Sequence, residues 1–357
     1  ASVQDKPDII VIMDESFADL SVLGSELRTN QSVTPFIDSL SENTIRGYAL
    51  SSVFGGGTPN SEYEFLTGNS LALAPGSIIY QQYLHGTTYS MVEELKENDY
   101  NCIAMHPFNA SGWRRPYAYS CLGFDETYFL DDFPQQDLVR SFVSDREMFE
   151  KVTALYEENK ASNQNVFLFG ITMQNHGGYN DNYDDFKEDI ILNGRYPLTQ
   201  RYLNLIHESD TAFKELTEYF EKVDEPTIIL FFGDHQPGIE ERFYEKLYKK
   251  NMEDLTLEEQ EKQYTVPYVI WANYDLPEVE KSDLISANYL SNLLMQTAGF
   301  KLTGKREVVA QAHAEYPAIN AKAVLTKDGE WIPRSEVEED EVLLKYHQLE
   351  YFMLFDE

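Results

Sequence analysis

A glycine-rich loop that leads into a threonine carries the first chemical signal in the sequence. Three consecutive glycines, Gly55 to Gly57, precede Thr58 and Pro59, and a stretch with helical spacing follows. Glycine permits close backbone approaches and proline suits the first position of a helix, so we expect Thr58 to be the N-cap residue. A helix N-terminus offers free N–H donors and a positive dipole end, which bind phosphate. Taken alone, the stretch is better explained as an ordinary helix cap.

Polar residues that can bind a metal ion stand at the ends of several apolar runs. These residues are Glu15, His106, His176, Asp234 and His235. If the runs are parallel strands, their carboxyl ends lie along one edge of a sheet, where ligands gather. Carboxylates, imidazoles and a hydroxyl oxygen suit either Zn²⁺ or Mn²⁺. One such strand end would be explained by a local hydrogen bond, but their recurrence favours a site.

The loop "HPFNASGWRRP" adds an aromatic and two basic side chains, Trp113, Arg114 and Arg115. An arginine can hold a phosphate with two parallel hydrogen bonds, and a tryptophan can stack on a sugar or glycerol face. The alternative is a basic surface loop with an anchoring aromatic residue. In so acidic a chain, adjacent arginines favour anion binding.

The composition restricts the partners. The chain of 357 residues has 28 Lys and Arg against 61 Asp and Glu, a formal net charge of −33. Bulk electrostatics therefore argue against nucleic acid or an anionic lipid surface, and an anionic substrate needs a local cation. No window approaches the roughly 18 apolar residues of a membrane span. Whether Cys102 and Cys121 are bridged stays open.

The alternation of strands and helices predicts the α/β fold that positions these candidate site residues. Short apolar runs, typical of buried β-strands, alternate with helical patterns, which predicts a mostly parallel sheet covered by helices on both faces. The strand-like runs are Asp8–Met13, Asn101–Met105, Asn165–Thr172, Pro226–His235 and Val266–Asn273. The helical patterns follow Thr34, Ser90 and Ser144 and fill Thr199–Lys222. We expect a catalytic domain over residues 1–304 and a small C-terminal α+β subdomain over 305–357, with a β-hairpin turning at 327–329 and a closing helix.

Six motifs, taken in order, resemble a known family. They are "MDES", "FGGGTPNSEYEFLTGNS", "HPFNASGWRRP", "VSDREMF", "MQNHGGY" and "GDHQP". The set is similar to the extracellular catalytic domain of the lipoteichoic acid synthase family, the phosphoglycerol transferase branch of the sulfatase and alkaline phosphatase superfamily. The resemblance spans roughly residues 7–273 and implies a sulfatase-like fold.

The resemblance implies a nucleophile and a metal site. It assigns Thr58 as the nucleophile and Glu15, Thr58, Asp234 and His235 as ligands of one divalent cation, Mn²⁺ in most relatives, with Mg²⁺ or Zn²⁺ as alternatives. It also implies that the chain departs from formylglycine sulfatases. The segment from Thr58 to Glu62 has neither the convertible Cys or Ser at its start nor the arginine that should follow.

The resemblance also implies the remaining site residues and the reaction. His176 and Arg115 match phosphate-contacting positions, and His106 and Trp113 match residues of a glycerol phosphate pocket. Arg114 departs from the family, whose members often carry an uncharged residue there. The implied mechanism is ping-pong: Thr58 takes phosphoglycerol from a phosphatidylglycerol-like lipid donor and passes it to an acceptor hydroxyl, with His176 protonating the leaving oxygen.

The implied setting is the outer face of a bacterial membrane, with membrane helices ahead of this domain in a longer protein. The implied acceptor is a glycolipid or glycopolymer such as lipoteichoic acid, although the segment after "GDHQP" does not match and leaves the acceptor open. Two alternatives remain. One is a phosphodiesterase, phosphatase or sulfatase-like hydrolase that passes the group to water, and the other is a non-catalytic domain that binds a surface polymer.

Overall fold

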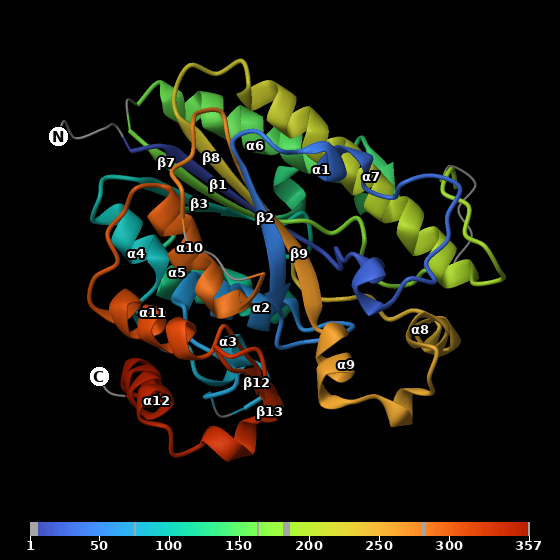
Figure 1. The fold of residues 1–357 in the computed structure, drawn as a ribbon. Helices are drawn as coiled ribbons and strands as arrows, with labels where there is room; N and C mark the ends of the chain where they lie inside the picture. The colour runs from blue at the N-terminus through green and yellow to red at the C-terminus, as the bar shows by residue number, and fades with distance from the viewer. Residues whose placement is uncertain (1–5, 75, 163, 181–185, 280–282, 356–357) are drawn as a thin grey trace.

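An eight-stranded β-sheet forms the centre of the fold (Figure 1). The computed structural model describes residues 6–74, 76–162, 164–180, 186–279 and 283–355. In spatial order the strands are β10 (Leu284–Ser286), β2 (Thr44–Leu50), β9 (Thr265–Ala272), β8 (Thr227–Gly233), β1 (Asp8–Asp14), β7 (Val166–Ile171), β3 (Asn101–Met105) and β4 (Glu126–Tyr128). Of these strands β9 alone runs antiparallel to its neighbours, β8 and β2. The predicted mostly parallel α/β sheet is confirmed.

The sequence pattern did not identify β2, β4 and β10. β2 is half-exposed along most of its length and contains Arg46 and Gly47, so it lacks the continuous apolar run of a buried strand. Gly47 has a packing reason, because a Cβ there would stand 2.6 Å from the Tyr268 hydroxyl on the neighbouring strand. β4 and β10 are short, with three residues each.

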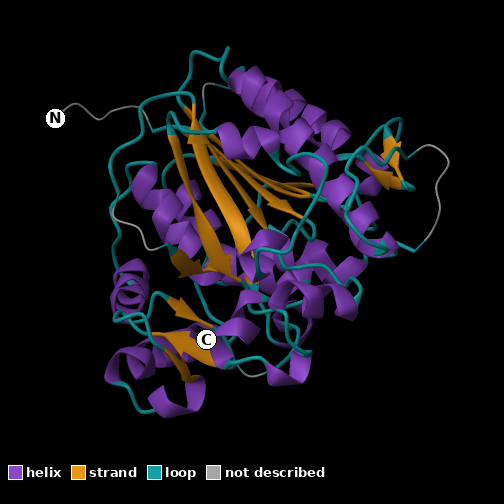
Figure 2. Cartoon of the chain, turned by 45° about the vertical axis from the view of Figure 1, so that its right-hand side comes forward, coloured by secondary structure: helices purple, strands orange, loops and turns teal. Residues whose placement is uncertain are grey.

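Helices cover both faces of the sheet, as predicted (Figures 1 and 2). One face packs against α1 (Pro35–Ser39), α6 (Asp145–Lys160), α7 (Pro197–Phe220) and α8 (Glu241–Tyr248). The other packs against α2 (Thr58–Thr67), α3 (Ile79–Gln82), α4 (Met91–Lys96), α5 (Arg115–Leu122) and α10 (Leu290–Thr297). The remaining elements are α9 (Leu257–Lys262) and the 3-10 helices η1 (Leu20–Leu23), η2 (Gly112–Arg114), η3 (Leu130–Asp132), η4 (Met252–Asp254), η5 (Ala287–Tyr289) and η6 (Arg334–Val337). Among the described residues, no helix combines the length and apolar character needed to cross a bilayer.

The start of α2 differs by one residue from the prediction. Thr58 is the first residue of the helix, and Gly57 is the N-cap, with a φ of 98° in the left-handed region that glycine adopts without strain. The shift has a chemical consequence, because the Thr58 hydroxyl is not used to cap the helix. The helical patterns predicted from Thr34, Ser90 and Ser144 do begin at these residues, which are the N-caps of α1, α4 and α6. The side chains of Ser90 and Ser144 accept hydrogen bonds from the first turn, whereas the Thr34 side chain makes no cap hydrogen bond.

The C-terminal region packs against the end of α2. It contains α11 (Lys305–Glu315), a small antiparallel sheet of β11 (Ala318–Ile319), β12 (Ala323–Leu325) and β13 (Trp331–Pro333), and α12 (Glu341–Phe355). The predicted hairpin and closing helix are therefore present. From α12, the Tyr346 hydroxyl donates to the Gly68 carbonyl, and the Glu350 carboxylate accepts from the Ser70 N–H at 3.0 Å. The division of the chain at residue 304 stays a prediction. Cys102 and Cys121 are both free and buried.

A buried carboxylate on α2 predicts pH-dependent stability. Burial raises the pKa of Glu64 to about 7, against hydrogen bonds donated by the Leu71 N–H and the Ser52 hydroxyl. The folded chain therefore holds this proton more tightly than the unfolded chain, so the free energy of unfolding should fall as pH rises from about 4.5 to 7. In urea unfolding, Glu64→Gln should remove about 3 kcal/mol of this fall. A variant profile parallel to that of the wild type would contradict the assignment.

A second prediction concerns the tight contact between β8 and the chain after β1. A Cβ at Gly233 would overlap the carbonyl oxygen of Phe17, which is backbone and cannot rotate away, whereas one at Gly170 would meet the flexible end of Met148. Gly233→Ala should cost about 3 kcal/mol or more and Gly170→Ala about 1 kcal/mol. Urea unfolding of both variants measures the difference, and equal costs would show that the backbone here can move.

Candidate active site

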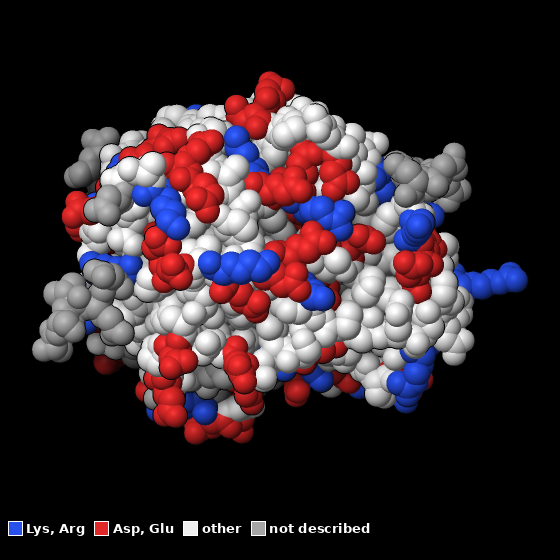
Figure 3. All heavy atoms as spheres, turned by 90° about the horizontal axis from the view of Figure 1, so that it is seen from above, with Lys and Arg blue, Asp and Glu red and all other residues white. Residues whose placement is uncertain are grey.

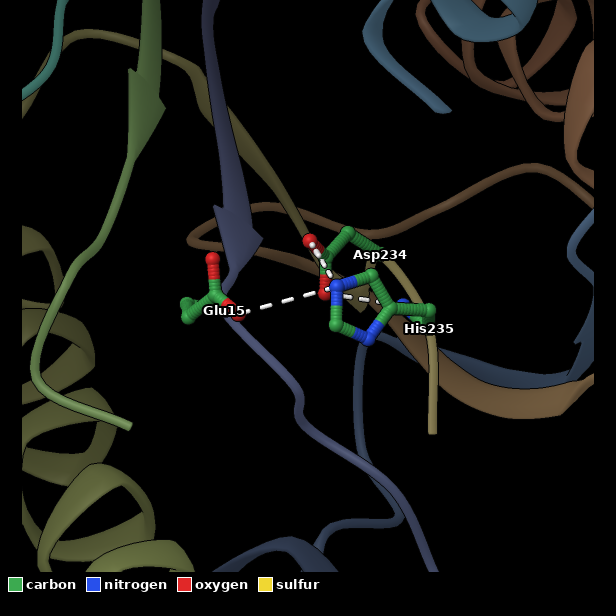
Figure 4. A group of neighbouring side chains, drawn as sticks. All are labelled: Glu15, Asp234 and His235. Carbon is green, nitrogen blue, oxygen red and sulfur yellow. Dashed lines mark hydrogen bonds and ion pairs between the residues drawn. The ribbon is translucent and has the colours of Figure 1, made fainter. Parts of the chain in front are cut away.

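The carboxyl ends of two neighbouring strands bring the predicted acidic residues together. β1 and β8 pair in parallel, with Asp14 opposite Gly233, so the residues that follow each strand lie side by side. Glu15 follows β1, and Asp234 and His235 follow β8. All three side chains are buried, with 4% or less of their surface exposed. Figure 4 shows the imidazole of His235 facing both carboxylates.

Backbone and hydroxyl donors fix the two carboxylates. The Asp234 Oδ1 atom accepts from the N–H groups of Ser16 at 2.7 Å and His235 at 2.8 Å. The Ser16 hydroxyl donates to Glu15 Oε1 at 2.8 Å, and the Glu15 N–H donates to the Thr172 hydroxyl at 3.0 Å. Because most of these donors belong to strand ends, the sheet itself sets the carboxylate positions.

The tautomer of His235 suits metal binding. Its Nδ1 lies 3.0 Å from the carbonyl oxygen of Gln236, which can only accept, so Nδ1 carries the proton. Nε2 then lies 3.3 Å from Asp234 Oδ2 and 3.6 Å from Glu15 Oε1 and makes no hydrogen bond to the described residues. Histidines that bind a metal ion commonly show this arrangement. One ring nitrogen donates to a carbonyl, and the other is buried with no hydrogen bond and has its lone pair available.

The electrostatics of the cluster also call for a cation. Burial raises the pKa of Asp234 to about 7, and the neighbouring Glu15 carboxylate adds to the rise. Burial alone would lower the pKa of His235, but the two carboxylates outweigh it and the pKa is raised. One ligand atom from each of the three residues lies within 4.8 Å of the others. These donors fit a divalent cation, whose charge would offset two buried carboxylates.

Thr58 joins this cluster from the opposite side. Its hydroxyl donates to Asp234 Oδ2 at 2.8 Å and lies 3.4 Å from Glu15 Oε2. The glycine loop before it is held against the end of β8, because the Gly55 N–H donates to the Gln236 carbonyl at 2.9 Å. The four residues predicted as metal ligands therefore converge on one point in the structure.

A cavity of about 210 Å³ opens over Thr58. This volume is below the roughly 300 to 1,000 Å³ typical for drug-sized ligands and suits a small headgroup. Glu15, Thr58 and His235 line it, and so do the predicted residues His106, Trp113, Arg115 and His176. Arg114 is not among the lining residues, and its guanidinium stacks on the Tyr117 ring at 4.7 Å. Every predicted site residue except Asp234 therefore lines this cavity, and Asp234 accepts a hydrogen bond from the Thr58 hydroxyl.

Arg115 is held by a carboxylate that the sequence reasoning missed. Its Nε and Nη2 donate to Glu62 Oε1 at 3.0 and 2.5 Å, and both side chains are almost fully buried. The Tyr119 hydroxyl donates to the other oxygen of Glu62 at 2.9 Å. Glu62 lies four residues after Thr58 on α2, hence on the same helix face. That spacing is the signal that could have identified it.

The two predicted pocket residues in the loop after β3 differ in exposure. His106 is 3% exposed, and burial lowers the pKa of its imidazole well below the usual value, so the ring is neutral. Its Nδ1 lies 3.1 Å from the Ile171 carbonyl, to which it donates. Trp113 is 40% exposed, with a φ of 57° that few bulky residues adopt. The neutral histidine forms the inner wall and the tryptophan the rim.

His176 reaches the cavity from a turn after β7. Its N–H donates to the Met173 carbonyl at 3.1 Å, and its ring lies 5.7 Å from the Phe142 ring, measured between centroids. The sequence reasoning missed two further residues here, Tyr179, which lines the cavity, and Arg140, which binds the carbonyl groups of this turn. Neither residue follows a strand of the central sheet, so the ends of the apolar runs could not identify them.

Acidic side chains predominate on the face over α6 and α7 (Figure 3). The cavity is different, because Arg115, His106 and His176 line it together with two residues of the carboxylate cluster, Glu15 and His235. Recognition of an anion therefore depends on these few groups and on a cation bound by the cluster, and not on the charge of the whole molecule.

Comparisons with solved structures agree with this architecture. The Streptococcus pyogenes phosphoglycerol transferase GacH, solved in complex with sn-glycerol-1-phosphate, superposes with a TM-score of 0.78 at 22% identity, over 98% of this chain and 86% of that one. The Listeria monocytogenes lipoteichoic acid synthase LtaP gives a TM-score of 0.70 at 21% identity, over 98% and 90% of the two chains. These likenesses show the fold.

Curated relatives are similar in sequence over most of this chain. A Rhizobium meliloti protein named for cyclic β-1,2-glucan modification is 29% identical over 98% of the chain and 55% of its own length. The capsular polysaccharide biosynthesis protein RkpI of the same organism is 29% identical over 66% of the chain and 42% of its own length. The chain spans about half the length of these relatives. The family model for sulfatase matches residues 7–300, and the chain therefore belongs to the sulfatase family.

Proposed function

We propose that this chain is a metal-dependent phosphoglycerol transferase that takes phosphoglycerol from a phosphatidylglycerol-like lipid donor. One observation carries the proposal: Thr58 lines a cavity of about 210 Å³, and its hydroxyl lies 2.8 Å from Asp234 Oδ2 and 3.4 Å from Glu15 Oε2. A hydroxyl held against two carboxylates and an imidazole is placed as a nucleophile that shares their cation.

The cluster residues would hold one divalent cation through Glu15, Thr58, Asp234 and His235. Mn²⁺ is our preferred metal, with Mg²⁺ and Zn²⁺ as alternatives, since the donors are mainly oxygen with one nitrogen. When bound, such an ion supplies Lewis acidity and lowers the pKa of a coordinated hydroxyl. The N-terminal position of Thr58 on α2 adds to this, because the free N–H groups and the dipole favour negative charge there.

The proposed reaction has two halves. In the first, the Thr58 hydroxyl passes its proton to Asp234 Oδ2, to which it donates, and Oγ1 attacks phosphorus. The bond from phosphorus to the diacylglycerol oxygen breaks, and His176 protonates that oxygen. The product is a glycerophospho-threonine at Thr58. In the second, His176 takes the proton of an acceptor hydroxyl and the acceptor oxygen bonds to phosphorus. The bond from phosphorus to Thr58 Oγ1 breaks, and Oγ1 takes its proton back from Asp234. A turn in the cavity wall is a suitable place for such a proton donor.

The other pocket residues would position the phosphoglycerol. Arg115 lies in the wall, where Glu62 holds two of its nitrogens, and its Nη1 makes no hydrogen bond to the described residues and is left for a phosphate oxygen. His106 and Trp113 would contact the glycerol, one from the inner wall and one from the rim. A guanidinium that is already fixed loses little rotamer freedom when a phosphate binds.

The names of relatives support an acceptor of the carbohydrate kind. The neighbours named above include a phosphoglycerol transferase and a lipoteichoic acid synthase, and the curated relatives are named for a glucan and a capsular polysaccharide. We therefore propose a glycolipid or glycopolymer acceptor at the outer face of a bacterial membrane. We further propose that membrane helices anchor the full-length protein.

The covalent step gives the first test. Incubated with Mn²⁺ and a phosphatidylglycerol headgroup substrate, the wild type should gain one glycerophosphate mass in intact-protein mass spectrometry. Thr58→Ala should gain none and lose turnover on the order of 10⁴-fold, as expected for removal of a nucleophile. The matched control is Thr67→Ala, which truncates a buried threonine at the other end of the same helix and should keep the adduct. An adduct on Thr58→Ala would contradict the assignment. Release of free glycerophosphate at the same rate with and without acceptor would indicate a hydrolase.

Metal removal gives the second test. Adding Mn²⁺ at 100 times its Kd should stabilise the chelator-treated wild type by about 2.7 kcal/mol, seen as a rise in Tm. Glu15→Gln and Asp234→Asn should lose this rise, because each removes a buried ligand. The control Glu253→Gln changes an exposed carboxylate and should keep it. An equal rise in all variants would show that the ion binds elsewhere.

A further inference from the structure

Arg140 is a buried arginine at the tip of a small hairpin. The hairpin joins β5 (Leu138–Val139) to β6 (Phe142–Val143), and Arg140 and Ser141 form the turn between them. Tips of hairpins are normally solvated, yet Arg140 is only 1% exposed and is among the largest fully buried side chains. Burial of a charged group is costly unless the group is well hydrogen-bonded, so we expect this guanidinium to donate several hydrogen bonds.

Among the described residues, the guanidinium makes its hydrogen bonds to the turn that carries His176. Its Nη2 donates to the carbonyl oxygens of Gln174 at 3.0 Å and His176 at 2.6 Å, and its Nη1 lies 3.4 Å from that of Gly178. The same group stacks 5.4 Å from the centroid of the Tyr179 ring. A planar fork of donors therefore holds alternate carbonyl groups on both sides of His176.

The backbone of the turn is strained in order to place this side chain. Arg140 has a φ of 51° and Ser141 a φ of 77°, both in the left-handed region. A two-residue turn with positive φ at both positions normally takes Asn-Gly, and other residues there are strained. Strain of this kind persists where the surroundings over-determine it, and it is concentrated at functional sites.

The hairpin is itself fixed to the core. The Glu147 carboxylate of α6 accepts from the N–H groups of Gln135 at 2.6 Å, Gln136 at 2.7 Å and Asp137 at 2.6 Å. The Ser144 N–H donates to the Asp137 carbonyl at 2.9 Å, which closes the base of the hairpin. The His176 loop is thus tied through Arg140 to a helix of the central fold.

We propose that Arg140 is a positioning residue, which holds the main chain around His176 so that the imidazole faces Thr58 across the cavity. This inference rests on the proposed role of His176 as the proton donor. Arg140 itself would not contact the substrate. The same contacts could merely stabilise the fold, so the test must follow His176 directly.

The experiment uses ¹³C-labelled histidine and NMR, with the His176 signal assigned from His176→Gln. Arg140→Gln removes both the charge and the planar set of guanidinium N–H donors. Arg140→Lys keeps the charge but lacks that planar set of donors. Both should shift or broaden the His176 signal, leave the other histidine signals in place, and lower the kcat of glycerophosphate transfer about tenfold or more, with a smaller change in KM. Ser141→Gly relieves strain in the same turn and should change neither the signal nor the rate.

An unchanged His176 signal in both Arg140 variants would overturn the proposal. A wild-type signal and rate in Arg140→Lys would also overturn it, because a positive charge at this position would then be enough without the guanidinium geometry. If Arg140→Gln does not fold, seen as loss of all dispersed histidine signals, Arg140→Lys decides. If the wild type transfers no glycerophosphate, the proposed function fails, while the His176 signal still decides whether Arg140 positions the loop.

Discussion

The burial of two carboxylates at neighbouring strand ends is the constraint on which the rest of this structure depends. Glu15 and Asp234 lie beside each other because β1 and β8 are adjacent parallel strands. Both side chains are buried, so water does not solvate their charges. Two such charges are costly in a protein interior unless a cation or protons offset them. The raised pKa of Asp234, to about 7, expresses this cost. A cation that stabilises the two buried carboxylates could also bind an anionic substrate in the cavity beside them.

A buried ion pair between Glu62 and Arg115 places α2, the helix that begins with Thr58. Thr58 and Glu62 stand one turn apart on α2, and Glu62 binds Arg115 from the first turn of α5. The position of Arg115 is therefore coupled to that of Thr58 through one helix turn. Breaking a buried pair of this kind would leave an uncompensated charge, which is far more costly than the pair is stabilising. The ion pair is better understood as fixing geometry than as adding stability.

Much of the site could be predicted because its ligands follow strands that are easy to recognise. Glu15, Asp234 and His235 end continuous apolar runs, and a parallel sheet must bring such ends together. The prediction was one residue wrong at Thr58, where the left-handed Gly57 takes the N-cap position. Ordinary cap statistics favour Thr over Gly, and no local pattern reports which residue adopts φ above zero. Arg140 could not be predicted, since its importance comes from carbonyl groups more than thirty positions away.

The central sheet and the surrounding loops position different parts of the candidate site. The sheet fixes the carboxylates and His235, so three of the candidate metal ligands are set by the strand ends of the central sheet. His176, Trp113 and the glycine loop lie on turns, several with positive φ, which are held by a few buried groups. Loops tolerate changes of sequence and length, so the wall of the cavity can change while the carboxylate cluster at the strand ends stays in place. Two relatives at 29% identity are named for a glucan and for a capsular polysaccharide, and a fixed cluster with a variable wall suits a family whose members carry such different names.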